Sequence, residues 1–241
     1  MRVVYILDVT ELKNSARQEE LLAGLNLERR KKVLKCVRPQ DQLRSLGAGL
    51  LLQYGIWRAI KEKESAILQK PEEILSDCAW ISVSLAQLEC TAGQAAQFCA
   101  DLDWTQNAHG KPYLNNIPIY FNLSHSASKV LCGVSDSEIG VDIQEMRNGN
   151  VKGIWKRFFD EREKMLLEQC DDLKAQEQLF YQMWAYKEAY GKFTGRGLMI
   201  DKSPWLDEQQ LGICFSQYGE LKGYAAVACY KEIPATGKEE R

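Results

Sequence analysis

Residues 180–197, FYQMWAYKEAYGKFTGRG, constrain the fold more than any other stretch of the chain. The first part contains neither Pro nor Gly and is rich in Met, Ala, Lys, Glu and aromatic residues, a composition that favours a helix. A cluster of glycines then ends it. On a helix, side chains four residues apart share one face, so Trp184, Glu188 and Lys192 are expected to lie side by side.

That face has two interpretations. A Glu four residues before a Lys is a common pair on solvent-exposed helices, and the pair alone does not point to a site. Two upstream segments, FNLSHS and IGVDIQE, would supply the partners that a functional face requires.

Composition limits the class of protein. A chain of 241 residues with 45% hydrophobic and 27% charged residues is typical of a soluble globule of one large or two smaller domains. The net charge of −2 gives no global field that favours nucleic acid or membrane. The apolar start before Asp8 is too short for a signal peptide, and the cysteines form no Cys-x-x-Cys pair. We therefore expect a cytoplasmic protein with reduced thiols.

The first half of the chain is expected to begin with a strand and continue as helices. Residues 2–8 are apolar enough for a buried strand, and residues 18–59 show helical periodicity. Pro39 is expected to end one helix and Asp41 to cap the next. Residues 79–85 are expected to form a strand or the start of a helix. The turn-rich residues 104–118 are expected to join the two halves of the chain.

The second half is expected to open with three short strands. The sequences IYFNLSHS, KVLCGVS and IGVDIQ carry this pattern, followed by helices over 154–170 and 175–193, strands over 211–216 and 221–230, and a disordered tail. The sequence thus predicts an α+β fold of two similar α/β lobes, residues 1–118 and 119–241. Their pseudo-twofold relation would place the active site at the lobe interface.

The segment IGVDIQE is a candidate metal site. In a strand, Val141 and Ile143 would face one side while Asp142 and Gln144 face the other. Together with Glu188 these oxygens suit a hard cation such as Mg²⁺, and two histidines are too few for a His-rich site. An edge strand with a polar outer face is the alternative.

Ser124 and His125 are candidate phosphate ligands at the end of a strand. Neighbouring side chains of a strand point to opposite faces, which disfavours a Ser-His nucleophile–base pair. A hydroxyl and an imidazole can both donate to phosphate oxygens. A purely structural role for His125 is equally compatible with the sequence.

Cations gather in the first half of the chain. A basic run follows Asn26, Arg44 and Ser45 lie near an expected helix start, where an anion is favoured, and Lys111 sits in a constrained Gly-Lys-Pro turn. A solvated helix face is the ordinary explanation of the run. Cations in one half and carboxylates in the other suggest a polyphosphate ligand, and neither a Walker A nor a G-x-G-x-x-G pattern occurs.

The ordered set ERRKK, RPQDQLRS, GKPYL, FNLSHS, IGVDIQE, FF…E and W-x-x-KEA-x-x-K-x-x-G-x-G resembles the 4′-phosphopantetheinyl transferases of the two-lobed, monomeric type that activates surfactin synthetase. The set spans residues 26–197. The resemblance implies transfer of the phosphopantetheine arm of coenzyme A to a serine of an apo acyl or peptidyl carrier protein, with release of adenosine 3′,5′-bisphosphate.

The resemblance also implies residue roles. Catalysis would involve Asp142, Glu188, Lys192 and His125, and Mg²⁺, with Mn²⁺ as an alternative, would be held by Asp142, Gln144 and Glu188. Coenzyme A would be bound by Arg29, Lys32, Arg44, Ser45, Gly110, Lys111, Pro112, Ser124, His125 and Lys192.

One departure from the family's pattern stands at Gln144, where members often carry a second carboxylate. It keeps open the alternative of a module that binds coenzyme A or another polyphosphate without turnover. The loop over residues 146–156, with Arg147, Lys152 and Trp155, has the composition of a carrier-docking surface or of an ordinary polar loop. The carrier, its pathway and the oligomeric state are not encoded in these motifs.

Overall fold

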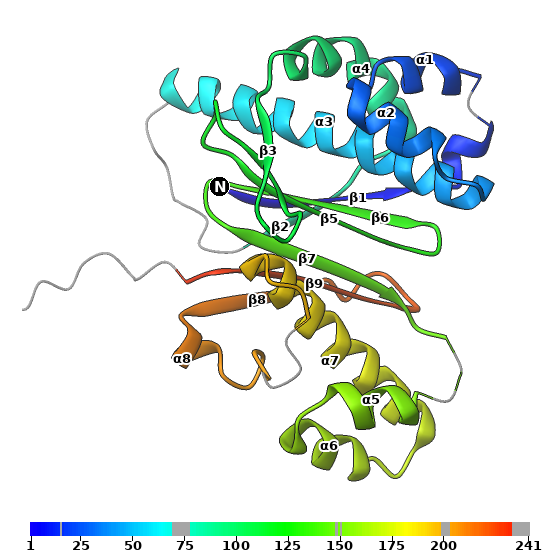
Figure 1. Ribbon diagram of the computed structural model, residues 1–241, viewed down its shortest axis with the longest axis vertical. Helices are drawn as coiled ribbons and strands as arrows, with labels where there is room; N and C mark the ends of the chain where they lie inside the picture. Colours follow the sequence, from blue (N-terminus) through cyan, green and yellow to red (C-terminus); the bar gives the residue numbers. More distant parts are fainter. Residues whose placement is uncertain (15, 69–77, 148, 150, 199–202, 233–241) are drawn as a thin grey trace, which may run out of the picture.

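The computed structural model describes residues 1–14, 16–68, 78–147, 149, 151–198 and 203–232. Helices and strands are mixed along the chain, which confirms the α+β class (Figure 1). In chain order the elements are β1 (Arg2–Asp8), the 3-10 helix η1 (Glu11–Asn14), α1 (Gln18–Ala23), α2 (Leu27–Leu34), α3 (Pro39–Leu68), β2 (Ala79–Ser82), α4 (Leu85–Cys99), β3 (Trp104–Gln106), β4 (Pro112–Leu114), β5 (Tyr120–Ser126), β6 (Lys129–Ser135), β7 (Ile139–Glu145), α5 (Lys152–Phe158), α6 (Glu161–Glu168), α7 (Leu173–Thr194), α8 (Glu208–Leu211), β8 (Ile213–Gln217) and β9 (Tyr224–Lys231).

Two sheets are stacked between helices. The larger sheet has the order β2-β1-β6-β5, and the smaller has the order β7-β9-β8. Helices α1 to α4 cover one side of the larger sheet, the smaller sheet lies on the other side, and α7 follows below the smaller sheet (Figure 1). The strands β3 and β4 form a separate hairpin.

The alternation of side chains along β1 explains its continuous apolar run. Val3, Tyr5 and Leu7 pack in the core beneath the helices, whereas Val4 and Ile6 pack between the two sheets. A strand buried on both faces needs apolar side chains at every position. The strand expected over residues 2–8 is confirmed.

The larger sheet runs across the boundary expected between residues 118 and 119. Strands β5 and β6 lie after that boundary, yet β6 pairs antiparallel with β1 along its whole length, from Arg2 opposite Ser135 to Asp8 opposite Lys129. The three-stranded sheet is built only from strands after residue 138.

The start of α3 differs from the sequence-based prediction. Pro39 is the first residue of α3 rather than the end of a preceding helix, and Asp41 lies in the first turn, where it pairs with Arg44. Proline is tolerated at a first helical position because that N–H has no helical acceptor. Arg44 and Ser45 therefore lie in the second turn, and the argument that placed them at the helix start was wrong.

Two further helix predictions were incomplete. The helix α4 was missed, although Ser84 and Gln87 form the capping box that begins it. The single helix expected over 154–170 is split into α5 and α6 because Asp160 caps a new helix after Phe159. The tail over 235–241 lies outside the described residues.

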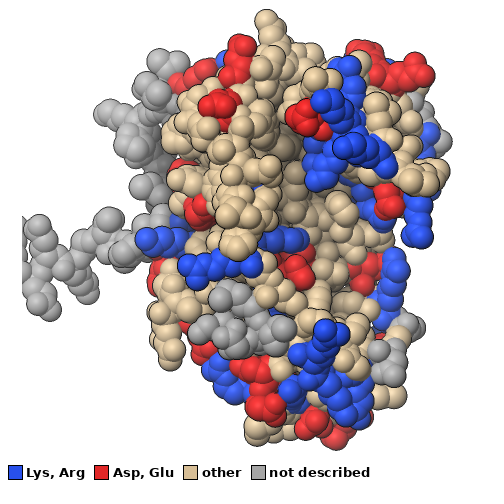
Figure 2. Space-filling view, viewed as in Figure 1, with Lys and Arg blue, Asp and Glu red and all other residues tan. Residues whose placement is uncertain are grey.

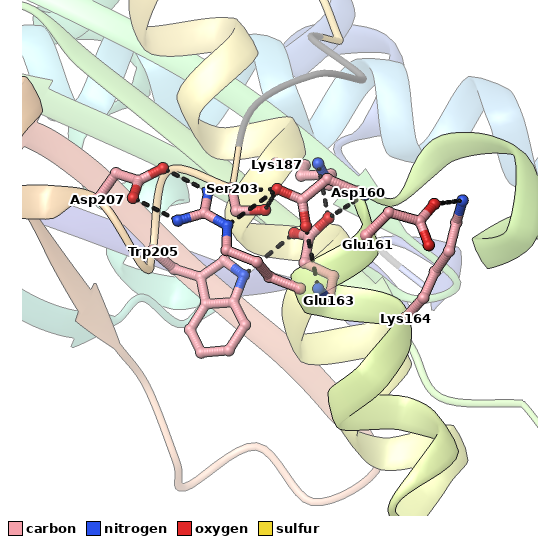
Figure 3. A network of polar contacts seen from close by, with 9 residues as sticks. Asp160, Glu161, Glu163, Lys164, Lys187, Ser203, Trp205 and Asp207 are labelled. Atoms are coloured by element: carbon pink, nitrogen blue, oxygen red, sulfur yellow. Dashed lines mark hydrogen bonds and ion pairs between the residues drawn. The ribbon is translucent and has the colours of Figure 1, made fainter.

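A fully buried ion pair joins α6 to α7. Lys187 Nζ lies 2.9 Å from Glu163 Oε2, and neither side chain is exposed. Glu163 also accepts hydrogen bonds from the Trp205 indole N–H, at 3.2 Å, and from the Asp160 backbone N–H (Figure 3). At the edge of this network Arg162 binds Asp207 through two hydrogen bonds of 2.7 Å. The network ties residues 203–207 to α6 and fixes α6 on α7.

The buried pair predicts a strong and non-additive effect on stability. Lys187→Met leaves the Glu163 carboxylate buried without a counter-ion, and we expect the free energy of unfolding in urea to fall by about 3–5 kcal/mol. The double variant Lys187→Met/Glu163→Gln removes both charges and should be more stable than Lys187→Met. The exposed pair Lys164–Glu161 is the matched control: Lys164→Met should cost less than about 1 kcal/mol. A double variant less stable than Lys187→Met would contradict this account.

Candidate functional site

A ladder of side-chain hydrogen bonds joins β5 to β7. Strand β7 is the edge of the three-stranded sheet, and its outward N–H groups find no strand partner there. Asn122 Oδ1 accepts from the N–H of Val141 at 3.0 Å, Ser124 Oγ from the N–H of Ile143 at 3.2 Å, and Ser126 Oγ from the N–H of Glu145 at 2.9 Å. The alternate polar positions of FNLSHS thus satisfy one edge of β7 and connect the two sheets.

Asp142, Lys192 and Ser124 form a compact polar cluster where β5, β7 and α7 meet. Lys192 Nζ lies 2.6 Å from Asp142 Oδ1 and 2.9 Å from Ser124 Oγ, and Ser124 Oγ donates to the same carboxylate oxygen at 2.9 Å. The Asp142 side chain is 2% exposed and that of Lys192 28%. The Ser124 hydroxyl is engaged on all sides, so it is not a free nucleophile.

Glu188 lies one helical turn before Lys192 and is half-buried. Burial raises the pKa of the Glu188 carboxyl above its ordinary value, and the neighbouring Asp142 raises it further, while Lys192 acts in the opposite direction. Neighbouring carboxylates repel each other when both are ionised, and a cation bound between them relieves this repulsion. The expectation that β7 turns Asp142 and Gln144 to one side is confirmed, because Gln144 Nε2 donates to Asp142 Oδ2 at 2.7 Å.

The residues present fit a hard cation in part. Asp142 and Glu188 offer carboxylate oxygens, whereas Gln144, as oriented, presents its amide nitrogen to Asp142. Within the described ranges no three His, Cys, Asp or Glu residues gather as a metal cage. A cation held here by two carboxylates would need further oxygens from water or a bound ligand, which is typical of Mg²⁺.

His125 lies on the other face of β5, beside cations from α2 and α3. The pKa of its imidazole is lowered by desolvation and by the nearby charges of Arg44, Lys192 and Arg29, which favours the neutral form of the ring. Arg44 also donates to the Ala127 carbonyl at 3.1 Å, which holds the β5–β6 turn where Ala127 adopts a positive φ of 48°.

Buried donors without partners mark the region around Ser45. Arg29 Nη2 donates to the Ser45 carbonyl at 3.3 Å, which joins α2 to α3. Among the described residues, no hydrogen-bond acceptor was found for Arg29 Nε, Arg44 Nε or the Ser45 hydroxyl, all of which are buried. Buried polar atoms normally have partners, so these donors fit an acceptor-rich ligand. Lys32 lies one turn from Arg29, and burial together with the Arg29 charge lowers the pKa of its ammonium.

Basic side chains gather outside this region as well. Figure 2 shows Lys and Arg side chains concentrated at the right of the upper half, where Figure 1 places α2 and the start of α3. Lys31, Lys32, Lys35 and Arg38 are exposed there. The basic run is thus partly the solvated face that its sequence suggests, and its buried members point inward.

The Gly-Lys-Pro turn lies between β3 and β4. Gly110 and Pro112 are exposed, with Gly110 at a φ of 82°, but Lys111 is buried. Lys111 Nζ forms an ion pair with Glu138 and donates to the Phe193 carbonyl at 2.9 Å. The structure therefore brings the Lys111 ammonium to the end of α7.

Two aromatic residues lie away from this site. Trp184 stacks on Phe159 and Phe180 and packs against Phe158 of α5, so its ring is engaged in an apolar cluster. Trp155 is 1% exposed and belongs to the same apolar cluster. Its expected contribution to a carrier-docking surface was wrong, because a buried indole cannot contact a partner.

The distance between α7 and β7 is set at Gly140. A Cβ built on Gly140 would lie 2.1 Å from the Ala189 carbonyl oxygen and 2.3 Å from the Phe193 nitrogen. No side chain larger than hydrogen fits at this contact. The close approach brings Lys192 within reach of Asp142.

The segment that contains β7 and α7 is similar to a known protein family. Residues 138–226, which include Asp142, Gln144, Glu188 and Lys192, match the model of the 4′-phosphopantetheinyl transferase superfamily. Over this segment the chain is similar to that superfamily. The match confirms the resemblance that the motifs carry.

Curated relatives align over about half of their length. The 4′-phosphopantetheinyl transferase gsp of Aneurinibacillus migulanus is 36% identical over 106 residues, 44% of each chain. The 4′-phosphopantetheinyl transferase Sfp of Bacillus subtilis (strain 168) is 33% identical over 102 residues, 42% of this chain and 45% of the relative. The 4′-phosphopantetheinyl transferase HetI of Nostoc is 37% identical over 133 residues, 53% of this chain and 54% of the relative. Separately, no described helix is long and apolar enough to cross a membrane.

Gly140→Ala tests the close approach of α7 to β7. The added methyl group meets backbone atoms that cannot move aside singly, so we expect a loss of unfolding free energy of at least about 3 kcal/mol. Gly153 on the exposed face of α5 has no heavy atom within 4 Å of a built Cβ, and Gly153→Ala should stabilise by about 0.5–1 kcal/mol. Equal effects of the two changes in urea unfolding would show that the contact at Gly140 is loose.

Proposed function

We propose that this protein transfers the 4′-phosphopantetheine arm of coenzyme A to a serine of an apo acyl or peptidyl carrier protein and releases adenosine 3′,5′-bisphosphate. The observation that carries the proposal is the buried cluster of Asp142, Lys192 and Ser124 with Glu188 beside it. Asp142, Glu188 and Lys192 lie within the segment that matches the superfamily, and Ser124 precedes it. The names of the curated relatives support the same chemistry.

The cations of the first half of the chain would bind the phosphates of coenzyme A. Arg29, Arg44 and Ser45 would surround the 3′-phosphate, because their buried and unpartnered donors suit its oxygens, and the exposed Lys32 ammonium would add a charge at its edge. Ser124 would contact a phosphate of coenzyme A only after its hydroxyl turns from Asp142, to which it donates. Lys192 would contact the pyrophosphate, and His125 would contact a phosphate group from the other face of β5. A neutral His125 can donate one hydrogen bond to it without adding a charge.

Asp142 and Glu188 would hold Mg²⁺, with Mn²⁺ as an alternative. Gln144 would join them through its amide oxygen only after the side chain turns from its present contact with Asp142. A bound divalent cation supplies positive charge that stabilises the oxygens of a leaving phosphate.

The protein's own residues then account for the proton and the charge. Glu188 takes the proton of the carrier serine while the serine oxygen bonds to the phosphorus atom that carries the pantetheine arm. The bond between this phosphorus and the oxygen that bridges the two phosphates of the pyrophosphate breaks. Lys192 neutralises part of the charge that develops on the departing bisphosphate, and a hydrogen bond from the neutral His125 imidazole stabilises it further. The raised pKa of the Glu188 carboxyl makes it a better proton acceptor than an ordinary carboxylate.

Each half of the chain would have its own role in this function. The residues before 119 would hold the nucleotide end of coenzyme A, with Gly110 and Pro112 at the exposed turn, and the later residues would carry the metal and catalytic groups. Helix α3 on one sheet and α7 on the other would be the pseudo-twofold counterparts of two lobes. The enzyme would act as a monomer in the cytoplasm, without nucleic acid or membrane.

A module that binds coenzyme A without turnover is the second candidate. It is favoured by one observation, the amide of Gln144 where a further carboxylate would strengthen a metal site. Transfer to a carrier protein separates the two functions.

The transfer assay combines purified protein, coenzyme A, Mg²⁺ and an apo-carrier, and reads the carrier by intact-mass spectrometry. We expect a phosphopantetheine-sized mass increase that is lost with EDTA. Glu188→Gln should slow transfer by about 10²–10⁴-fold, because it removes the proton acceptor, while calorimetry still detects coenzyme A binding. Glu168→Gln, an exposed carboxylate on α6, is the control and should be silent. Binding without any transfer across several carriers would favour the second candidate, and near-normal turnover of Glu188→Gln would remove Glu188 from the mechanism.

Gln144→Glu tests the departure from the family's pattern. The variant adds a third carboxylate beside Asp142 and Glu188. We expect it to be active and to need a lower Mg²⁺ concentration for half-maximal transfer. The measurement is a Mg²⁺ titration of the transfer rate, with Gln178→Glu on the exposed face of α7 as control. Complete inactivity of Gln144→Glu would instead give the amide donor a specific role at Asp142.

A further inference from the structure

Lys111 is buried although both of its neighbours in the turn are exposed. Its side chain is 6% exposed, and its ammonium has three protein acceptors, the Glu138 carboxylate and the carbonyls of Phe193 and Ile139. An ammonium group has three N–H donors, so this set uses all of them. None is left for a phosphate of coenzyme A.

The three acceptors join elements that meet at the site. Phe193 lies in the last turn of α7, where backbone carbonyls have no further helical donor and carry partial negative charge. Glu138 directly precedes β7, and Ile139 is its first residue. Lys111 therefore holds the end of α7 against the beginning of β7. Its two carbonyl acceptors lie close to the site in sequence, since Phe193 directly follows Lys192 and Ile139 lies three residues before Asp142.

Asn107 provides a second contact from the same loop. Its side-chain oxygen accepts from the N–H groups of His109 and Lys111, each at 2.9 Å, which fixes the loop. Its amide nitrogen donates to the carbonyl of Gly195 at 3.3 Å. Gly195 ends α7 in a left-handed conformation, and a Cβ there would lie 2.7 Å from the Asn107 amide and 3.2 Å from Lys111 Cδ. Loop and helix end are thus in close contact.

We propose that the loop Asn107–Lys111 is a clamp that sets the position of Lys192, with Lys111 and Asn107 as positioning residues. The inference rests on the proposed function and assigns Lys111 a different role from the nucleotide contact that the family resemblance implies. Because Gly110 and Pro112 face solvent while Lys111 points inward, a ligand on the outer side of the turn would be coupled through the clamp to Lys192.

The test compares Lys111→Met with the wild-type enzyme in two measurements. In the transfer assay, kcat should fall at least tenfold while the KM and the calorimetric Kd for coenzyme A stay within threefold. In hydrogen–deuterium exchange of the ligand-free protein, amides of residues 193–197 should exchange at least tenfold faster. Arg58→Met, which removes an ion pair with Glu62 on α3, is the control and should change neither.

A direct nucleotide contact would give the opposite result: the Kd for coenzyme A would rise tenfold or more, with kcat and the exchange of residues 193–197 unchanged. That outcome would overturn the clamp. If Lys111→Met does not fold, Glu138→Gln and Asn107→Ala carry the test. The first removes the negative charge that faces Lys111, the second removes the side-chain hydrogen bonds of Asn107 to Gly195, His109 and Lys111, and each should show the same pattern to a smaller degree. If the wild-type protein transfers to no carrier, the proposed function fails, and the exchange measurement still decides whether the clamp exists.

Discussion

The hydrogen bonds from β5 side chains to the β7 backbone are the constraint on which the site depends. An edge strand buried against another sheet must satisfy its outward N–H groups, and Asn122, Ser124 and Ser126 do so at every second residue. The ladder fixes the offset between the two sheets. Because Ser124 Oγ accepts a hydrogen bond from the Ile143 N–H, the hydroxyl also lies beside the side chain of the preceding residue, Asp142. One serine therefore serves the fold and the polar cluster together.

The electrostatics of the site follow from this placement. Asp142 is almost fully buried, and Lys192 is the cation that compensates it in the ligand-free protein. Glu188 adds a second carboxylate with a raised pKa, and on the other face of β5 His125 lies among cations from α2 and α3. Carboxylates on one side and buried cationic donors on the other form an arrangement suited to a polyphosphate that brings a divalent cation with it.

The sequence predicted much of the fold and part of the site, for local reasons. The alternation of side chains along IGVDIQE correctly predicted that Asp142 and Gln144 face the same side. Helical spacing predicted that Glu188 and Lys192 lie on one face of a helix. The ladder was missed, although polar residues at alternate positions 122, 124 and 126 are its signal. Helical spacing put Trp184 on the same face of α7, but it cannot tell which neighbour covers a face, and Trp184 stacks on Phe159 and Phe180. The roles of Lys111 and of the Lys187–Glu163 pair depend on contacts between segments far apart in the chain, and no local pattern contains them.

The proposed function requires coenzyme A and a divalent cation to bind the same cluster, so each must strengthen the binding of the other. The most direct test is calorimetric titration of coenzyme A into the wild-type protein and Asp142→Asn, each with Mg²⁺ and with EDTA. The account predicts that Mg²⁺ tightens binding at least tenfold in the wild-type protein and has no effect in Asp142→Asn. Equal affinity of the wild-type protein with Mg²⁺ and with EDTA would contradict it.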